Sequence, residues 1–372
     1  MRSRSDRTRK DTEAHGELAV IGAGAWGSTL AALEAGNFTR VNIYTPEADV
    51  AEELLRFGSN ERYLGEYRLP RNVFPFGVMG RAVEGAEMVL VAVPSSVIRQ
   101  VARAIKPMLT EHVPVVLATK GLETGSGLLS LEVWRQELAT SHRRGTRDAM
   151  VLSGPNLASE LRAGRPALSL LAGTDPQTTA AAARRLCVPS LSLIPHGDPL
   201  GAQAAGALKN VYAVACGIAS GLSWGDNALG ALIWRGLAET SSFAEAVGGE
   251  PEVALTPAGV GDFVATCCSP LSRNHDLGRT IAGMAPGEEV RGVREGAQTA
   301  REAARRARSL SLDLPLLEAV WAVMEGAERP AAILDAAIGP SAGETERDAR
   351  VHERATGLAA LRAAPGFGLA PE

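Results

Sequence analysis

Short apolar runs and longer stretches of helical length alternate along the first half of the chain, from Glu17 to about Pro195. The runs are rich in β-branched residues and too short for helices, so each one predicts a buried strand. Helical stretches, such as 97–108 and 178–186, lie between several of them. This alternation is typical of an α/β fold with a doubly wound, mostly parallel sheet. Strands are predicted at 18–21, 41–44, 88–93, 113–118, 149–152, 168–171 and 191–194.

The pattern changes after Gly197, where every predicted element is a helix. The chain therefore divides near residue 196 into an α/β domain, residues 17–196, and an all-α domain, residues 197–335. A cleft between two such domains is the natural place for a small-molecule site. Helices are predicted at 199–217, 227–247, 299–308 and 315–326.

Both ends of the chain have the composition of tails. Residues 1–16 are basic and polar and lack the apolar segment of a secretory signal, so we expect a disordered tail or an over-extended start. Residues 336–372 are rich in Ala, Gly, Pro and charged residues, which predicts a C-terminal extension with a short helix. Neither end carries an obvious site.

The composition argues against several classes of function. The chain is 45% hydrophobic and 22% charged, and it has no apolar run of about 18 residues, so we expect no membrane span. A net charge of −4 argues against a large nucleic-acid surface. The four cysteines lack zinc-ligand spacing, so we expect no metal, and their sparse use suits a reducing cytoplasm.

The first predicted strand runs into the sequence Gly22-Ala-Gly24-Ala25-Trp26-Gly27, followed by a helical stretch. In this context GxGxxG predicts a dinucleotide site. The first glycine permits a tight turn, the second lets a pyrophosphate approach the backbone, and the third lets the helix pack on the strand. Trp26 is either a lid over the cofactor or an ordinary core residue, and the sequence leaves both interpretations open.

The second predicted strand ends near Glu47, about where a side chain should meet the adenine ribose. An acidic residue there favours the free 2′-hydroxyl of NAD over the 2′-phosphate of NADP. We therefore favour NAD as a hypothesis. The alternative is that Glu47 is a solvated residue at a helix start with no contact to the ribose.

Lysine is rare in this chain, since only four of the 38 basic residues are lysines. A position that keeps lysine among so many arginines raises the question of whether it needs an amine that can lose a proton. Lys120 ends a predicted strand and should point into the crevice at the carboxyl edge of the sheet, unless it is a surface charge. Lys209 lies in an apolar helical stretch, which predicts desolvation, a lowered pKa and a role as general base, unless it snorkels to the surface.

Three polar segments are further candidates for binding an anionic substrate. Residues 153–156 (Ser-Gly-Pro-Asn) follow a strand and can turn backbone N–H groups towards an oxygen-rich ligand. Asp262 could orient Lys209, although an isolated Gly-Asp is usually only a turn. Residues 272–274 (Ser-Arg-Asn) offer a fork of donors for a phosphate, although this short pattern is weak on its own.

The joint order and spacing of these motifs resemble the bacterial NAD(P)-dependent sn-glycerol-3-phosphate dehydrogenase family over about residues 17–330. No single motif is decisive, but the set is far more specific than a dinucleotide fingerprint. The matching segments are 22–27, 60–64, 93–95, 119–122, 154–160, 208–211, 225–228, 235–239, 261–262, 266–267, 272–274 and 293–296.

The resemblance implies a Rossmann domain that binds NAD or NADP and an all-α substrate domain. It also implies reversible reduction of dihydroxyacetone phosphate to sn-glycerol 3-phosphate for phospholipid synthesis, by a cytoplasmic enzyme that is expected to be a homodimer. The implied catalytic residues are Lys209, as proton acceptor, with Asp262 and Lys120. The implied substrate-binding residues are Lys120, Gly154, Asn156, Lys209, Asn210, Asp262, Thr266, Ser272, Arg273 and Asn274. The implied cofactor-binding residues are Gly22, Gly24, Ala25, Trp26, Gly27, Lys120, Arg273, Val293 and Glu295.

Several residues depart from the pattern of the family. Asn156 stands where many bacterial relatives have Ser or Thr, and Trp234 where they usually have Thr. Pro46 replaces a basic or histidine residue, which leaves the choice of cofactor open. The departures keep two alternatives in view: a paralogue acting on another small phosphorylated ketone or hydroxy acid, and a nucleotide-binding sensor without catalysis. Retention of the candidate catalytic residues opposes the sensor.

Overall fold

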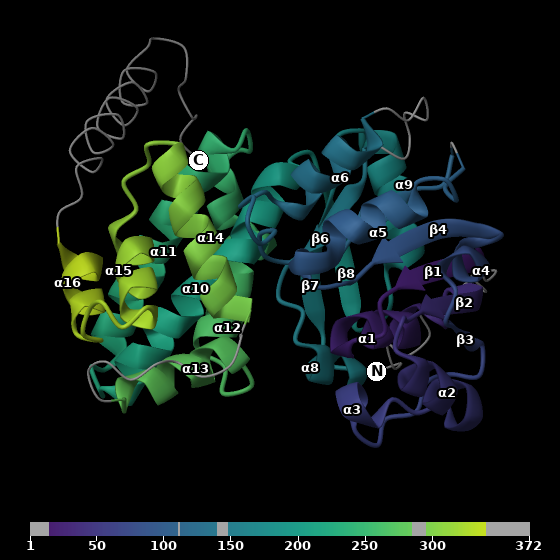
Figure 1. Cartoon of the computed structure of the whole chain (residues 1–372), viewed down its shortest axis with the longest axis horizontal. Helices are drawn as coiled ribbons and strands as arrows, with labels where there is room; N and C mark the ends of the chain where they lie inside the picture. Colours follow the sequence, from purple (N-terminus) through teal and green to yellow (C-terminus); the bar gives the residue numbers. More distant parts are fainter. Residues whose placement is uncertain (1–14, 111, 140–147, 285–294, 340–372) are drawn as a thin grey trace, which may run out of the picture.

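The computed structural model describes residues 15–110, 112–139, 148–284 and 295–339. Its N-terminal half is built on one eight-stranded sheet (Figure 1). The strands are β1 (His15–Ile21), β2 (Phe38–Tyr44), β3 (Val73–Phe76), β4 (Ala86–Val91), β5 (Val115–Leu117), β6 (Met150–Ser153), β7 (Ala167–Ala172) and β8 (Leu191–His196).

The spatial order of the strands is β3-β2-β1-β4-β5-β6-β7-β8, and every neighbouring pair is parallel except β6 and β7. Strand β1 pairs with both β2 and β4, so the order of connections reverses there. Ligands of doubly wound sheets bind at the carboxyl ends of the strands beside such a reversal. The predicted fold class, an α/β Rossmann sheet followed by helices, is confirmed.

The prediction located seven of these strands and missed β3. This strand is only four residues long and contains Pro75, which has no N–H to give to a sheet ladder. It lies at the edge of the sheet and pairs only with β2, the place where proline is tolerated.

Successive residues of each central strand enter two different cores, one on each face of the sheet. In β1, Leu18 and Val20 pack on one face, whereas Ala19 and Ile21 pack on the other. Helices α1 (Ala25–Glu34), α2 (Ala48–Phe57) and α9 (Pro176–Leu186) cover the first face. Helices α5 (Ile98–Ile105) and α6 (Ser130–Leu138) cover the second. Short helices complete this half: α3 (Glu61–Leu64), α4 (Met79–Val83) and α8 (Ala158–Arg162).

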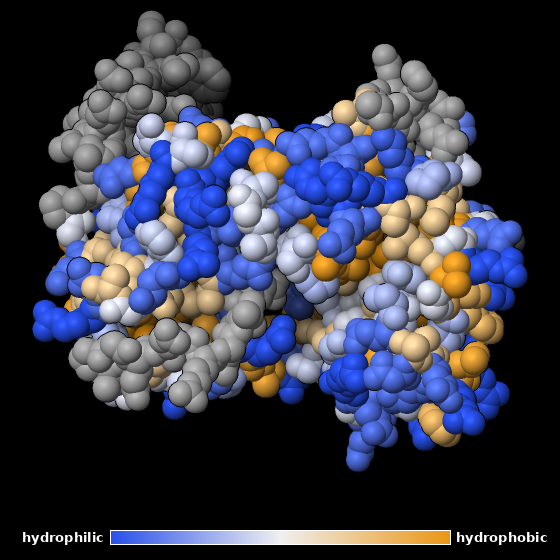
Figure 2. Space-filling model, in the orientation of Figure 1, coloured by the Kyte–Doolittle hydropathy of each residue, from blue (hydrophilic) through white to orange (hydrophobic). Residues whose placement is uncertain are grey.

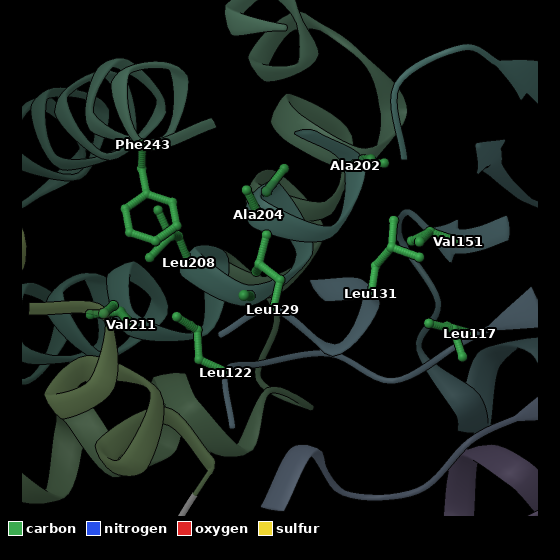
Figure 3. Packing of buried hydrophobic residues seen from close by; sticks show 14 of the residues in the cluster. Leu117, Leu122, Leu129, Leu131, Val151, Ala202, Ala204, Leu208, Val211 and Phe243 are labelled. Atoms are coloured by element: carbon green, nitrogen blue, oxygen red, sulfur yellow. The ribbon is translucent and has the colours of Figure 1, made fainter. Parts of the chain in front are cut away.

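The C-terminal half is helical and is organised around α10 (Pro199–Gly221). Residues 201–219 of α10 are all buried, because its many Ala and Gly residues let neighbours approach from every side. The core on the second face of the sheet continues through α10 into the helical half. Figure 3 shows this continuity, from Leu117 and Val151 on the sheet side to Val211 and Phe243 among the helices.

The remaining helices pack on α10, except α16, which packs on α11 and α15. Three of them were not among the predicted helices: α12 and α16 have only six and seven residues, and α13 is largely polar. Helix α16 also crosses residue 335, where the sequence suggested the end of the domain, and the Arg235 guanidinium donates to the carbonyl of Gly339 at 2.7 Å. The elements are α11 (Asp226–Ala246), the 3₁₀ turn η2 (Pro251–Leu255), the π turn η3 (Pro257–Gly261), α12 (Asp262–Cys267), α13 (Arg273–Ala282), α14 (Glu295–Ser309), α15 (Pro315–Met324) and α16 (Ala332–Ile338).

Within the described ranges, every helix is too short or too polar to cross a lipid bilayer.

Candidate active site

The turn from β1 into α1 has the geometry that a dinucleotide requires. Gly22 has φ +110°, and a Cβ there would lie 2.5 Å from the carbonyl oxygen of Ala92. A Cβ on Gly27 would lie 1.9 Å from the carbonyl oxygen of Gly22, so only glycine lets the helix start this close to the strand. A Cβ on Gly24, in contrast, would meet no atom within 4 Å. The space above Gly24 is therefore open for a pyrophosphate at the start of α1, and these residues fit NAD or NADP.

The two neighbours of Gly24 in the motif lie at the start of α1. Ala25 is the first residue of the helix. Trp26 is partly buried and packs against the core on the α1 face of the sheet. Of the two interpretations of Trp26, this packing favours the core residue, and a contact with the cofactor stays a prediction.

Asn60 is a functional candidate that the sequence interpretation missed. It is fully buried, and its side-chain amide donates to the carbonyl of Ala23 at 2.8 Å and to the hydroxyl of Ser28 at 3.0 Å. It therefore ties the segment after α2 to the dinucleotide turn. The only available signal was its place in the matching segment 60–64, which carried no assigned role.

The structure brings Lys120, Lys209 and Asp262 together, although they come from three separate elements. Lys120 follows β5, Lys209 lies in the middle of α10, and Asp262 is the first residue of α12. The Lys120 amine donates to Asp262 Oδ2 at 2.6 Å, and the Lys209 amine donates to Asp262 Oδ1 at 2.5 Å. One carboxylate thus orients two lysines, one on each oxygen, at a site where the Asp262 side chain is 1% exposed.

Two further contacts fix the lysines. Lys209 also donates to the hydroxyl of Thr266, one turn along α12, at 2.9 Å. Lys120 donates to the carbonyl of Gly154 at 3.0 Å. The cluster holds two amines against one carboxylate, so it carries a net positive charge when both amines are protonated. Such a site suits an oxygen atom that gains negative charge during a reaction.

Burial and, less strongly, the neighbouring charge of Lys209 lower the pKa of Lys120 to about 8, against the attraction of Asp262. The sequence analysis predicted a lowered pKa for Lys209, and that stays a prediction; the lowered pKa found here belongs to Lys120, for which none was predicted. Because its pKa is close to neutral, both the neutral and the charged amine are accessible at physiological pH.

The loop after β6 lines the site beside Lys120. Gly154 has φ +150°, and a Cβ there would lie 2.5 Å from the hydroxyl of Ser169, so glycine is required. The Ser169 hydroxyl donates to Asn156 Oδ1 at 2.6 Å, which turns the amide nitrogen the other way. That nitrogen is buried and has no hydrogen-bond partner among the described residues, so it is free for a ligand. Ser169 was not among the predicted site residues.

The predicted phosphate fork lies at the start of α13. Ser272 caps the helix by accepting from the N–H of His275 at 3.2 Å, and Arg273 is the exposed first residue of the helix. Asn274 is buried, and its Oδ1 accepts from the N–H of Gly296 at 3.2 Å.

Three other predicted site residues lie in α10, just before α14 and at the start of α14. Asn210 is buried next to Lys209 in α10. Val293 lies outside the described residues, and Glu295 is described only as the backbone start of α14.

Comparison with protein families agrees with this geometry. Residues 17–179 match the family model for the N-terminus of NAD-dependent glycerol-3-phosphate dehydrogenase, and residues 198–335 match the model for its C-terminus.

Individual proteins are similar over most of the chain. The glycerol-3-phosphate dehydrogenase [NAD(P)+] of Nitrosomonas europaea is 36% identical over 313 residues, which are 82% of this chain and 92% of that protein. The Sinorhizobium fredii protein of the same name is 39% identical, with 83% and 92% covered. The crystal structure of glycerol-3-phosphate dehydrogenase from Coxiella burnetii superposes with a TM-score of 0.78 at 29% identity, covering 88% of this chain and 99% of that one. The chain therefore belongs to the NAD-dependent glycerol-3-phosphate dehydrogenase family.

Proposed function

We propose that the chain catalyses the reversible, NAD(P)H-dependent reduction of dihydroxyacetone phosphate to sn-glycerol 3-phosphate. The observation that carries the proposal is the pair of lysines held on one buried aspartate, with Lys120 from the sheet half and Lys209 and Asp262 from the helical half. Figure 2 shows a recess between the sheet half and the helical half on this face of the molecule. When bound, the cofactor supplies the hydride for reduction and accepts it for oxidation.

Lys209 is the proposed proton donor and acceptor. In reduction, its ammonium gives a proton to the C2 oxygen of dihydroxyacetone phosphate while C2 gains the hydride. In oxidation, its neutral amine takes the proton of the C2 hydroxyl. Asp262 and Thr266 hold this amine in place, at 2.5 and 2.9 Å. Lys120 brings a second positive charge that stabilises the developing alkoxide.

A direct assay tests this proposal. The purified chain should oxidise NADH or NADPH in the presence of dihydroxyacetone phosphate, and the product should be sn-glycerol 3-phosphate. Binding of NADH without turnover at millimolar substrate would contradict the proposal and favour the alternative of a nucleotide-binding sensor without catalysis. Turnover of another small phosphorylated ketone at a much higher kcat/KM would favour the paralogue.

Arg273 is the proposed contact for the substrate phosphate. Arg273→Ala should raise the KM for dihydroxyacetone phosphate by about 10- to 100-fold, because a charge-assisted hydrogen bond to phosphate contributes about 1.5–3 kcal/mol. Steady-state kinetics at saturating NADH measure the change. Arg279→Ala, which removes an exposed arginine from the last turn of the same helix, is the matched control and should leave KM unchanged. An equal change in both variants would contradict the assignment.

The titration of Lys120 makes a prediction for the pH dependence. The rate of dihydroxyacetone phosphate reduction should fall as the pH increases through about 8, because Lys120 then loses the positive charge that stabilises the developing alkoxide. Lys120→Met has no charge to lose at this position, so its kcat should be lower at neutral pH and should not show this midpoint. Profiles of kcat against pH for both proteins test this, and an unchanged midpoint in Lys120→Met would contradict it.

We further propose that the enzyme acts in the cytoplasm, in phospholipid synthesis, and as a homodimer. The support for these three points is the resemblance to the bacterial family, and a mass measurement in solution tests the last of them.

A further inference from the structure

Glu239 is a buried acid in the helical half that the proposed reaction does not use. It lies in α11 and is 4% exposed. Its carboxylate accepts from the Tyr212 hydroxyl at 2.8 Å and from the N–H groups of Leu316 and Leu317, at the start of α15, at 2.7 and 3.0 Å. Burial raises the pKa of Glu239 to about 7, although these three donors lower it. A carboxylate is costly to bury unless donors surround it, and this one joins α10, α11 and α15 at a single point.

The side chain of Tyr212 connects this point to the catalytic cluster. Tyr212 follows Lys209 by three residues, so both side chains lie on the same side of α10. The centroid of its ring lies 5.6 Å from that of Phe263, the residue that follows Asp262 in α12. Both aromatic side chains are fully buried. The ring pair therefore joins α10 to α12 next to the two residues that form the Lys209–Asp262 contact.

Helix α11 closes the third side of this ring pair. Helices α10, α11 and α12 pack against one another (Figure 1). A Cβ on Gly236 would lie 2.9 Å from Cγ of Tyr212 and 2.9 Å from Cε1 of Phe263, so α11 approaches both rings more closely than any other residue type would allow. Gly236 lies one turn before Glu239. Helix α11 thus holds the ring of Tyr212 at one turn and its hydroxyl at the next.

The ring pair controls the shortest contact in the catalytic cluster. Lys209 Nζ lies 2.5 Å from Asp262 Oδ1, and the two residues come from different helices, α10 and α12. A slide or rotation of α10 against α12 would separate the amine from the carboxylate. A misplacement of about 1 Å at a reacting group can lower a rate by up to about 100-fold.

We propose that Tyr212, anchored by Glu239, is a positioning residue for the reaction: it fixes α10 against α12 and so keeps Lys209 in contact with Asp262. Tyr212 and Glu239 act through Lys209 and touch no substrate. This inference rests on the proposed function, because it concerns the orientation of the proposed proton donor.

Tyr212→Phe tests the inference, because it removes the hydroxyl that Glu239 holds and keeps the ring. We expect kcat for dihydroxyacetone phosphate reduction to fall by about tenfold. The KM for dihydroxyacetone phosphate and the Kd for NADH should stay within about twofold, because the hydroxyl acts only on the reacting step. Glu239→Gln should show the same split between kcat and KM, because its amide NH₂ group would face a donor where the carboxylate accepts.

Thr240→Val is the matched control. Thr240 is buried on the same helix as Glu239, and its hydroxyl donates to the carbonyl of Gly236 at 2.7 Å, within α11. The substitution removes one buried hydrogen bond but leaves Tyr212 and Glu239 paired, so kcat should stay within about twofold of the wild type. Thermal unfolding of all three variants measures the loss of stability separately from the loss of rate.

A double-mutant cycle separates positioning from a general loosening of the structure. Asp262→Asn already breaks the contact that Tyr212 is proposed to maintain. Adding Tyr212→Phe to this variant should therefore lower kcat by less than about twofold further. A merely structural role for the hydroxyl would give the same tenfold loss in both backgrounds.

Three results would overturn the inference. These are an unchanged kcat in Tyr212→Phe, an equal fall of kcat in Thr240→Val, or the full further loss in the double variant. Failure of the proposed function would look different, because the wild type itself would then not reduce dihydroxyacetone phosphate. In that case a crystal structure of Tyr212→Phe decides the inference: the Lys209 amine should lie beyond hydrogen-bond distance of Asp262, and an unchanged contact would refute the positioning role.

Discussion

Lys209→Arg should lower kcat for dihydroxyacetone phosphate reduction by at least about 10³-fold. The guanidinium keeps the positive charge, but it does not give up a proton at working pH. Lys209 is 7% exposed and is held by Asp262 and Thr266, so no water can easily take over its place. Steady-state kinetics at saturating NADH and substrate measure the loss. Lys209→Ala should lose turnover as well, while both variants largely retain NADH binding.

The chain offers a matched control for this substitution. Lys106 follows α5 and donates to the carbonyl of Glu137 at 2.8 Å. Helix α5 covers one face of the sheet, and α1, which follows the dinucleotide turn, covers the other. Lys106→Arg makes the same chemical change there and should leave kcat unaltered. Near-normal turnover by Lys209→Arg would rule out Lys209 as the proton donor.

Asp262→Asn should have the second largest effect, because it leaves two amines together without a carboxylate. We expect kcat to fall by about 10²- to 10⁴-fold, since Lys209 loses the group that orients it. The variant should also be less stable, because removing one partner of a buried ion pair costs about 3–5 kcal/mol. Asp226→Asn changes another aspartate in the first turn of a helix, at an exposed place, and should alter neither quantity.

The loss of stability in Asp262→Asn should depend on pH. Asp262 raises the pKa of Lys120 against the effect of burial, so its removal lowers that pKa below about 8. Between the pKa of the folded state and the higher pKa of the unfolded state, the unfolded chain binds more protons, so stability rises with pH. The deficit in Tm should therefore be larger near neutral pH than in alkaline buffer, and a deficit that grows with pH would contradict the electrostatic account.

The sheet and the dinucleotide turn could be predicted because each depends on a local pattern. Apolar runs marked seven strands, and the steric roles assigned to the glycines at 22 and 27 are borne out by their surroundings, whereas the approach of a pyrophosphate at Gly24 stays a prediction. Strand β3 was missed because it contains Pro75. Proline is tolerated only in an edge strand, and the sequence alone does not show which strand lies at the edge of the sheet.

The candidate site could be predicted only in part. Lys120 and Lys209 stood out because lysine is rare in this chain. Lys120 also ends a predicted strand, and Lys209 lies in an apolar helical stretch. The contact of Lys120 with Asp262 joins residues 142 positions apart, and local patterns carry no information on such a pairing. The same reason explains why Asn60 and Ser169 were missed, since each acts through a partner that only the fold brings near.

Chemical rescue of Lys209→Ala tests the central claim, proton transfer by Lys209, most directly. Methylammonium has a proton that it can give to the C2 oxygen, whereas tetramethylammonium carries the same charge without one. We predict that added methylammonium restores reduction of dihydroxyacetone phosphate in this variant and that tetramethylammonium does not. Equal restoration by both cations would show that the site needs only a positive charge, and it would contradict the claim that Lys209 transfers the proton.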